Sequence, residues 1–137
     1  MNTTIVPVEY IDRFWDEVRP LLEPAVEVTS GRFTTYDVYV GLQQGRYHLW
    51  VSFNDNGKIV GCVVTEVVDY PSKRCLNMLF TAGKGIKDWM SSMNDMLGRW
   101  ASEQGCELIE GHGRIGWSRL VRKLGCRPLA CTFERDV

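Results

Sequence analysis

The stretch from Lys73 to Gln104 constrains the fold most strongly. An apolar, strand-like run over residues 75–80 passes through Thr81-Ala82-Gly83-Lys84-Gly85 directly into an amphipathic helical pattern. Its apolar positions are Trp89, Met90, Met93, Met96, Leu97, Trp100 and Ala101. A strand, a glycine-containing turn and a helix in this order can bind a phosphate, because the first helical N–H groups have no intrahelical partner and lie at the positive end of the helix dipole. The same pattern also marks ordinary strand-to-helix connections, so both interpretations stay open.

The composition favours a soluble globular protein. A chain of 137 residues is long enough to bury about two thirds of its unfolded surface, and we expect one domain over residues 1–137. With Lys+Arg 16 and Asp+Glu 17 the net charge is −1, which predicts no general attraction to nucleic acid or to anionic membranes. The N-terminus lacks a basic region followed by a long apolar core, and no apolar run approaches membrane-spanning length, so we expect an intracellular protein.

The cysteine pattern favours reduced thiols. The five cysteines lie in apolar, strand-like runs without the spacing of a metal site. They are Cys62, Cys75, Cys106, Cys126 and Cys131. We therefore expect buried, reduced side chains, and the sequence contains no metal-binding constellation.

The first part of the chain has the periodicity of helices. Residues 11–25 place apolar side chains at helical spacing, with charged residues on the other face. Pro20 and Pro24 are expected to kink or break this helix, because each lacks an N–H and crowds the preceding turn. Thr34 or Thr35 can cap a second, shorter helix.

The middle of the chain has the signals of an antiparallel meander. Residues 46–53 alternate as a strand does, and Asn54-Asp55-Asn56-Gly57 is a hairpin signal. The returning run, residues 58–68, is apolar on nearly every residue, so we expect a strand that is covered on both faces and lies centrally in the sheet. The turn at residues 70–73 then leads into the strand at residues 75–80.

The last part of the chain is expected to add two strands around a short helix. A strand at Cys106–Ile109 follows the long helix, and we expect it to run parallel to residues 75–80, because a helix separates the two. A short basic helix is expected from Trp117 to Leu124, and a final strand from about Cys126 to Glu134.

This order of elements resembles the Gcn5-related N-acetyltransferase (GNAT) superfamily. Three local features carry the resemblance: the hairpin sequence at residues 56–61, the Gly83-Lys84-Gly85-Ile86 loop, and the sequence of the late helix at residues 120–126. More narrowly, the chain resembles small GNAT-like proteins of tailed bacteriophages and prophages, in which similar Trp-Val, Val-Gly, Tyr-Pro, Asp-Trp and Gly-Cys pairs recur. The resemblance implies an α/β fold with a mixed, mostly antiparallel, twisted sheet flanked by helices, and a wedge between two parallel central strands.

The resemblance also implies a coenzyme site. In the family, the pantetheine arm of acetyl-CoA lies in the wedge and its pyrophosphate contacts the glycine loop. Carried over to this sequence, the cofactor-binding residues are Met78, Leu79, Phe80, Gly83, Lys84, Gly85, Ile86 and Lys87. Two positions depart from the family pattern, because Ala82 stands where Gln or Arg is usual and Lys87 where Gly or Ala is usual. Lys84 and Lys87 can compensate for the missing arginine, or the pocket has decayed.

The catalytic residues are harder to transfer. Amine acetylation needs a base for the ammonium proton and an acid for the leaving thiolate. The family's usual tyrosine acid aligns with Val121, which can donate nothing, and the strand at residues 75–80 has no glutamate. The candidates left are His112, Glu110 and Glu66. His112 has the most suitable intrinsic pKa. Each also fits a plain alternative, as an exposed loop histidine or as a carboxylate at the sheet margin.

Tyr70 and Ser118 are candidate proton donors to a thiolate, although their spacing distinguishes neither. The expected activity is direct transfer of an acetyl group from acetyl-CoA, used as cosubstrate, to an unidentified amine in the cytoplasm of a bacterium or a phage-infected cell. The alternative is a non-catalytic GNAT-like module in phage assembly or host interaction. We expect neither nucleic acid nor membrane as a partner. The oligomeric state stays open, a homodimer included.

Overall fold

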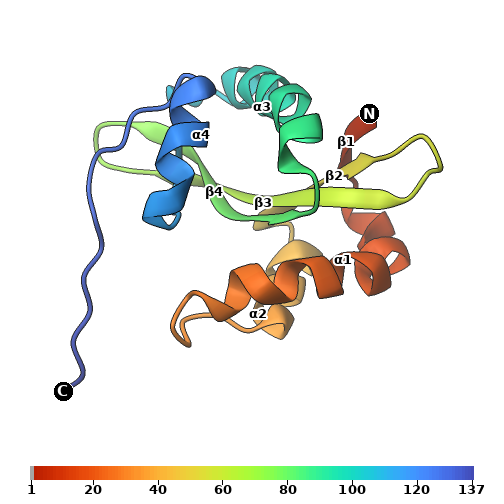
Figure 1. Cartoon of the computed structure of the whole chain (residues 1–137), viewed down its shortest axis with the longest axis horizontal. Coiled ribbons are helices and arrows are strands. Elements are labelled where there is room, and N and C mark those ends of the chain that lie inside the picture. Colours follow the sequence, from red (N-terminus) through yellow and green to blue (C-terminus); the bar gives the residue numbers. More distant parts are fainter. Residues whose placement is uncertain (1) are drawn as a thin grey trace.

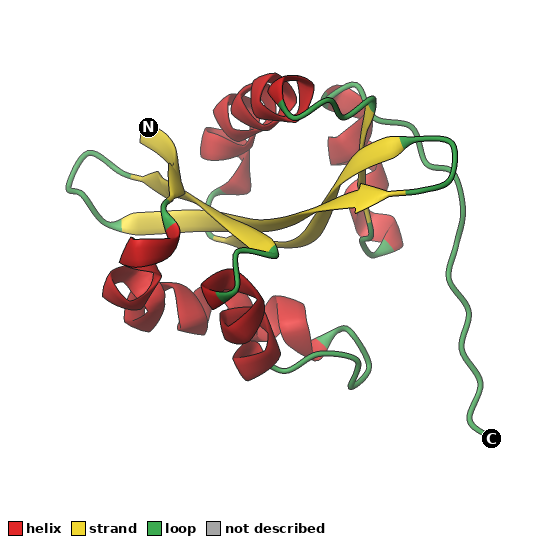
Figure 2. Cartoon of the chain, turned by 180° about the vertical axis from the view of Figure 1, so that it is seen from behind, coloured by secondary structure: helices red, strands yellow, loops and turns green. Residues whose placement is uncertain are grey.

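The computed structural model describes residues 2–137 and shows a five-stranded sheet with helices on both faces (Figure 1, Figure 2). The elements, in chain order, are β1 (Asn2–Val6), α1 (Ile11–Glu27), α2 (Thr35–Gln43), β2 (Tyr47–Phe53), β3 (Ile59–Asp69), β4 (Arg74–Gly83), α3 (Ile86–Glu103), β5 (Leu108–Gly111) and α4 (Ser118–Lys123). Short 3-10 turns precede α1 and α4. Helices α1 and α2 cover one face of the sheet, and α3 covers the other (Figure 1).

The sheet has the order β1-β2-β3-β4-β5. All neighbours are antiparallel except β4 and β5, which are parallel as predicted. The predicted central position of the apolar strand is also confirmed, because β3 lies between β2 and β4. The hairpin that leads into β3 forms at Asn54, whose side-chain Oδ1 accepts hydrogen bonds from the backbone N–H groups of Asn56 and Lys58, both at 3.0 Å.

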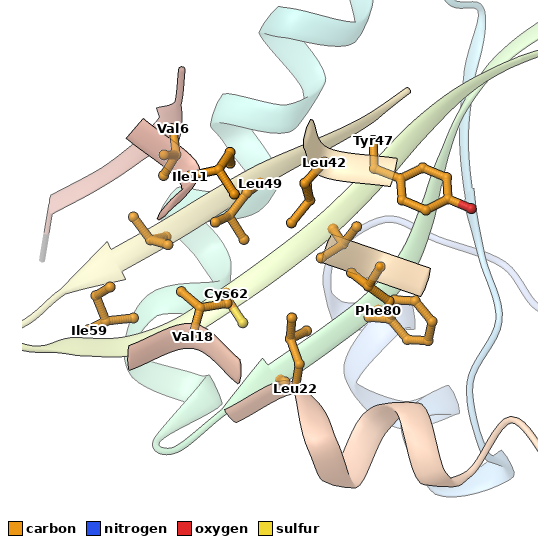
Figure 3. Packing of buried hydrophobic residues seen from close by; sticks show 14 of the residues in the cluster. Val6, Ile11, Val18, Leu22, Leu42, Tyr47, Leu49, Ile59, Cys62 and Phe80 are labelled. Carbon is orange, nitrogen blue, oxygen red and sulfur yellow. The ribbon is translucent and has the colours of Figure 1, made fainter. Parts of the chain in front are cut away.

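One hydrophobic core lies between the sheet and the pair α1 and α2 (Figure 3). Its fully buried side chains include Val18 and Leu22 from α1, Leu42 from α2, and Leu49 and Cys62 from the strands. This packing buries the apolar face of α1, as the helical spacing of its apolar residues predicted.

A second core lies between the sheet and α3. Trp50, Trp89, Met93 and Leu97 are among its largest side chains, and each is at most 1% exposed. The indole Nε1–H of Trp50 donates to the hydroxyl of Thr65 at 3.0 Å, so this buried polar atom is satisfied. The sheet therefore carries apolar layers on both faces, which explains why β3 is almost continuously apolar in sequence.

We expected Pro20 and Pro24 to kink or break the first helix, and the structure contradicts a break. Helix α1 runs from Ile11 to Glu27 with Pro20 and Pro24 inside it. Both prolines lie on the exposed face, where water can hydrogen-bond the carbonyl groups that lose their helical N–H partner. The predicted cap of α2 is confirmed, because the Thr34 hydroxyl accepts the N–H of Asp37 and the Asp37 carboxylate accepts the N–H of Thr34.

The two ends of the chain differ from expectation. Residues 2–6 form β1, which the sequence analysis missed, and the predicted strand from Cys126 to Glu134 is absent from the described structure. Pro128 cannot donate to a strand ladder. The Glu134 carboxylate instead accepts from the Ser30 hydroxyl at 2.7 Å and from the Arg32 guanidinium at 3.0 Å, so this segment runs toward the α1–α2 loop (Figure 1).

This difference changes two further expectations. The parallel strand β5 lies at the edge of the sheet rather than centrally, since no described strand follows it. Cys126 and Cys131 are exposed, whereas Cys62 and Cys75 are buried as expected and Cys106 is partly buried. In the part of the chain that is described, no helix is both long and apolar enough to span a membrane.

Candidate functional site

The two parallel strands part after a short paired stretch. Their register runs from Cys75 opposite Leu108 to Met78 opposite Gly111, where β5 ends while β4 continues to Gly83. A β-bulge lies at the same point, because Val64 pairs with Phe80 and Thr65 with Met78, which leaves Leu79 as the additional residue. Bulges bend a strand and re-aim its side chains. Beyond Met78, β4 therefore continues without a paired residue in β5.

The glycine loop after β4 is held tightly to the sheet. Gly83 has φ +133°, and a Cβ at this residue would lie 2.3 Å from the carbonyl oxygen of Val60 and 2.6 Å from the Cα of Gly61. The backbone N–H of Lys84 donates to Val60 O at 2.9 Å, and the indole of Trp89 donates to Lys84 O at 2.9 Å. Gly83 is thus required by its close approach to β3, a reason that involves no ligand.

Gly85 begins helix α3. It is the N-cap residue in a left-handed conformation, with φ +62°, and the N–H of Asp88 donates to its carbonyl oxygen at 2.8 Å. Lys84 and Lys87 are exposed on either side of it. The carboxylate of Asp88 opposes the positive charge of these lysines. It lies close to Gly85, with Oδ2 3.1 Å from the position that a Cβ of Gly85 would occupy. Two ammonium groups against one carboxylate at a helix N-terminus fit a pyrophosphate group.

A row of polar side chains crosses the sheet next to the point where β4 and β5 separate. Tyr47 of β2 is paired with Glu66 of β3, Glu66 with Asn77 of β4, and Asn77 with Glu110 of β5. Directly paired residues project on the same face of a sheet. Because Tyr47 belongs to the core under α1 and α2 (Figure 3), the whole row projects on that face. Two of the predicted catalytic residues, Glu66 and Glu110, therefore flank Asn77.

Asn77 is the residue that sequence reasoning missed. It is only 8% exposed, and its side-chain Oδ1 is buried without a hydrogen-bond partner among the described residues. Buried amide oxygens are normally paired, so an unpaired one requires an explanation. Its signal was present in the sequence, because Asn77 is the one polar residue in the run from Cys75 to Phe80.

Tyr70 and Glu110 form a hydrogen-bonded pair at the end of this row. The Tyr70 hydroxyl donates to Glu110 Oε1. This bond raises the pKa of Tyr70 above its ordinary value, with smaller contributions from burial and from the Glu110 charge. Burial, followed by the same carboxylate charge, raises the pKa of the Cys75 thiol. The structure thus brings together two residues that the sequence analysis considered separately.

The other predicted residues lie around this row. His112 follows β5 in an exposed loop, outside the strand that carries Glu110. Val121, at the position of the usual tyrosine acid, is half-buried in α4. Helix α4 is linked to α3 by the Asn94 side-chain N–H, which donates to Leu124 O at 3.4 Å. Among the residues that the structure describes, no cluster of three or more His, Cys, Asp or Glu residues could hold a metal ion.

A surface cavity of about 510 Å³ opens next to α2 and the start of β2. Phe33, Tyr36, Asp37, Arg46 and Tyr47 are among the residues that line it. The Phe33 ring makes an edge contact with Phe80 at a centroid distance of 5.4 Å, which places this cavity beside the bulged part of β4. The Arg46 guanidinium donates to the Tyr47 hydroxyl at 3.0 Å and fixes that ring at the end of the polar row.

Comparison with solved structures identifies the fold. The chain is similar to a GNAT family acetyltransferase of Staphylococcus aureus, with a TM-score of 0.69, 10% sequence identity, and coverage of 99% of this chain and 98% of the other. It is also similar to an aminoglycoside acetyltransferase from an uncultured soil metagenomic sample in complex with sisomicin, with a TM-score of 0.72, 14% identity, and coverage of 99% and 95%. A ribosomal-protein-alanine N-acetyltransferase from Brucella melitensis gives a TM-score of 0.68 at 15% identity, with coverage of 100% and 99%.

The fold of this chain is therefore that of the GNAT acetyltransferases, as the sequence order predicted. At these identities the likeness concerns the fold. No protein-family model and no curated protein matches the chain by sequence. The acceptors named for these structures, an aminoglycoside and a ribosomal protein, differ widely, so the fold alone does not define an acceptor.

Proposed function

We propose that this protein is an acetyl-CoA-dependent N-acyltransferase of the GNAT superfamily. The observation that carries the proposal is the parting of β4 and β5 at Met78 and Gly111, next to a loop with two exposed lysines at a helix N-terminus. The backbone of Met78, Leu79 and Phe80, at and beyond the last residue of β4 that pairs with β5, would pair with the amide groups of a pantetheine arm. Gly83, Lys84, Gly85, Ile86 and Lys87 would surround the pyrophosphate.

The proposed chemistry is direct transfer. The nitrogen of a neutral amine attacks the thioester carbonyl, an N–C bond forms, the C–S bond breaks, and the thiolate leaves and takes up a proton. The protein must hold the amine in position and accept the proton that its ammonium form loses. We assign the base to His112, Glu110 or Glu66, and we propose the hydroxyl of Tyr70 as proton donor to the thiolate in place of the tyrosine missing at Val121.

A non-catalytic role is the second candidate. Val121 favours it, since this side chain cannot supply the proton that the family's usual tyrosine gives. In this alternative the chain keeps the fold and binds a protein in phage assembly or host interaction. The resemblance to phage and prophage proteins stays a prediction. The location in the cytoplasm of a bacterium or a phage-infected cell also stays a prediction.

The deciding experiment is a calorimetric titration with acetyl-CoA and with coenzyme A. We expect micromolar binding, which corresponds to about 8 kcal/mol. Replacing Lys84 and Lys87 by alanine should weaken it about tenfold or more, because two charge contacts to phosphate are lost. Arg99→Ala is the matched control, since Arg99 is also exposed on α3 and lies about 20 Å along the helix from Ile86 at 1.5 Å per residue.

No binding by the wild type would exclude the enzyme and favour the second candidate. Equal weakening in Arg99→Ala would refute the placement of the pyrophosphate at the loop. If coenzyme binds, His112→Ala should slow acetyl transfer in an amine screen without weakening coenzyme affinity. Unchanged turnover would remove His112 from the mechanism.

A further inference from the structure

The unpaired oxygen of Asn77 belongs to a residue that is paired with a glutamate on each of the two neighbouring strands. Glu66 and Glu110 occupy the neighbouring strands at the same register, so their Cα atoms are about 10 Å apart, which is two strand spacings. Both side chains are half-buried and project on the face of Asn77. Two carboxylates on either side of an unsatisfied hydrogen-bond acceptor form a site that lacks only positive charge and N–H donors.

From this arrangement we infer that the row Glu66–Asn77–Glu110 binds the primary ammonium group of the acceptor, with Asn77 as a positioning residue. A primary ammonium carries three N–H donors and one positive charge. One donor satisfies Asn77 Oδ1, and the positive charge is complementary to the two carboxylates. The inference rests on the proposed function, and it narrows the acceptor to compounds with an unhindered alkylammonium group.

The position of the row agrees with such a role. Asn77 and Glu110 form the second-to-last residue pair between β4 and β5, one pair before the two strands separate. An amine held there lies one residue from the end of the β4–β5 pairing, beside which the thioester would be placed. Glu110 is already hydrogen-bonded by Tyr70, so the same carboxylate contacts both the ammonium site and the proposed proton donor.

The energetics of Asn77 distinguish this role from a structural one. A buried oxygen without a partner destabilises the folded protein, and replacing it by an apolar group of similar size is neutral or stabilising. Asn77→Leu should therefore keep or raise the melting temperature while it removes ammonium binding. A residue whose side chain supports the fold would show the opposite, a fall in melting temperature.

The test uses small probes and the full chain. Butylammonium, butyltrimethylammonium and butanol are titrated while the NMR signals of the Asn77 side-chain amide and of the β4 and β5 backbone are followed. Butylammonium supplies charge and N–H donors, butyltrimethylammonium supplies charge alone, and butanol supplies neither charge nor an N–H. We expect saturable shifts of the Asn77 signals with butylammonium only, and at least a tenfold loss of affinity in Asn77→Leu and in Glu66→Gln.

The outcomes separate this inference from the proposed function. Equal binding of butyltrimethylammonium, or shifts that leave Asn77 unaffected, would overturn it, and so would a lower melting temperature of Asn77→Leu. Acetyl-CoA is titrated separately and reports through the signals of residues 83–87. Coenzyme binding without ammonium binding would refute only the acceptor site, and ammonium binding without coenzyme binding would refute only the transferase.

Discussion

Replacing Gly83 by alanine should unfold the loop that positions the candidate coenzyme site. The new Cβ would lie 2.3 Å from Val60 O and 2.6 Å from the Cα of Gly61. Both atoms belong to the backbone of the central strand, which is paired on both sides and cannot move away. Separating the strands would also stretch the hydrogen bond from Lys84 N–H to Val60 O.

Two terms set the size of the effect. The φ of +133° is strained for any residue with a Cβ, at about 1–3 kcal/mol. Overpacking against fixed backbone adds about 1–3 kcal/mol. We therefore expect Gly83→Ala to lose about 3 kcal/mol of the free energy of unfolding, and the melting temperature to fall by about 10 °C for a chain of this size.

Gly98→Ala is the matched control. Gly98 lies within α3, is exposed, and has open space where a Cβ would be, with no neighbouring atom within 4 Å. Alanine there should stabilise the helix by about 0.5–1 kcal/mol, because glycine is a poor helix former. Urea unfolding followed by circular dichroism measures both variants. A loss below about 1 kcal/mol in Gly83→Ala would contradict the close approach of the loop to β3.

Two further predictions concern titratable groups. Burial lowers the pKa of His48 below its ordinary 6.5, an effect only partly offset by a hydrogen bond to the Thr65 backbone, so the unfolded chain binds the proton more readily. The contribution of His48 to the free energy of unfolding should be constant above about pH 6.5 and should fall as the pH drops below it. This fall between pH 7.5 and 5.5 should be smaller in His48→Phe, and an identical fall in both proteins would refute the assignment. For the cysteines, we expect an aromatic disulfide reagent to label Cys126 and Cys131 rapidly at pH 8, and Cys62 only on unfolding, because burial raises its pKa to about 12. Mass spectrometry of the labelled peptides checks this, and rapid labelling of Cys62 would count against its buried position.

The elements with strong periodic patterns could be predicted from the sequence. Helix α3, the hairpin at Asn54 and the central position of β3 each follow from local signals that agree with the packing. The segment after Cys126 could not be predicted, because its alternating apolar pattern competes with Pro128 and with the ion pair of Glu134 and Arg32. Strand β1 was missed, although Thr3 to Val6 are all β-branched, since its pairing with β2 depends on a distant partner.

The sequence predicted which residues of the candidate site carry reactive groups, but not how those residues are arranged. Glu66 and Glu110 were identifiable as carboxylates near strand ends, but their positions on either side of Asn77 depend on the register of β3, β4 and β5. That register in turn depends on the bulge at Leu79, which a sequence does not display.

The glycine loop shows that a glycine motif in the sequence does not by itself establish a binding site. Gly83 and Gly85 first suggested an anion site, yet close approach to β3 and a left-handed N-cap explain both glycines without a ligand. The evidence for a coenzyme therefore rests on features that folding does not require. These are the β4 backbone that continues past the end of β5 and the exposed side chains of Lys84 and Lys87. The unpaired oxygen of Asn77 is likewise not required for folding, and because it costs stability it supports the proposed acceptor site rather than the coenzyme site.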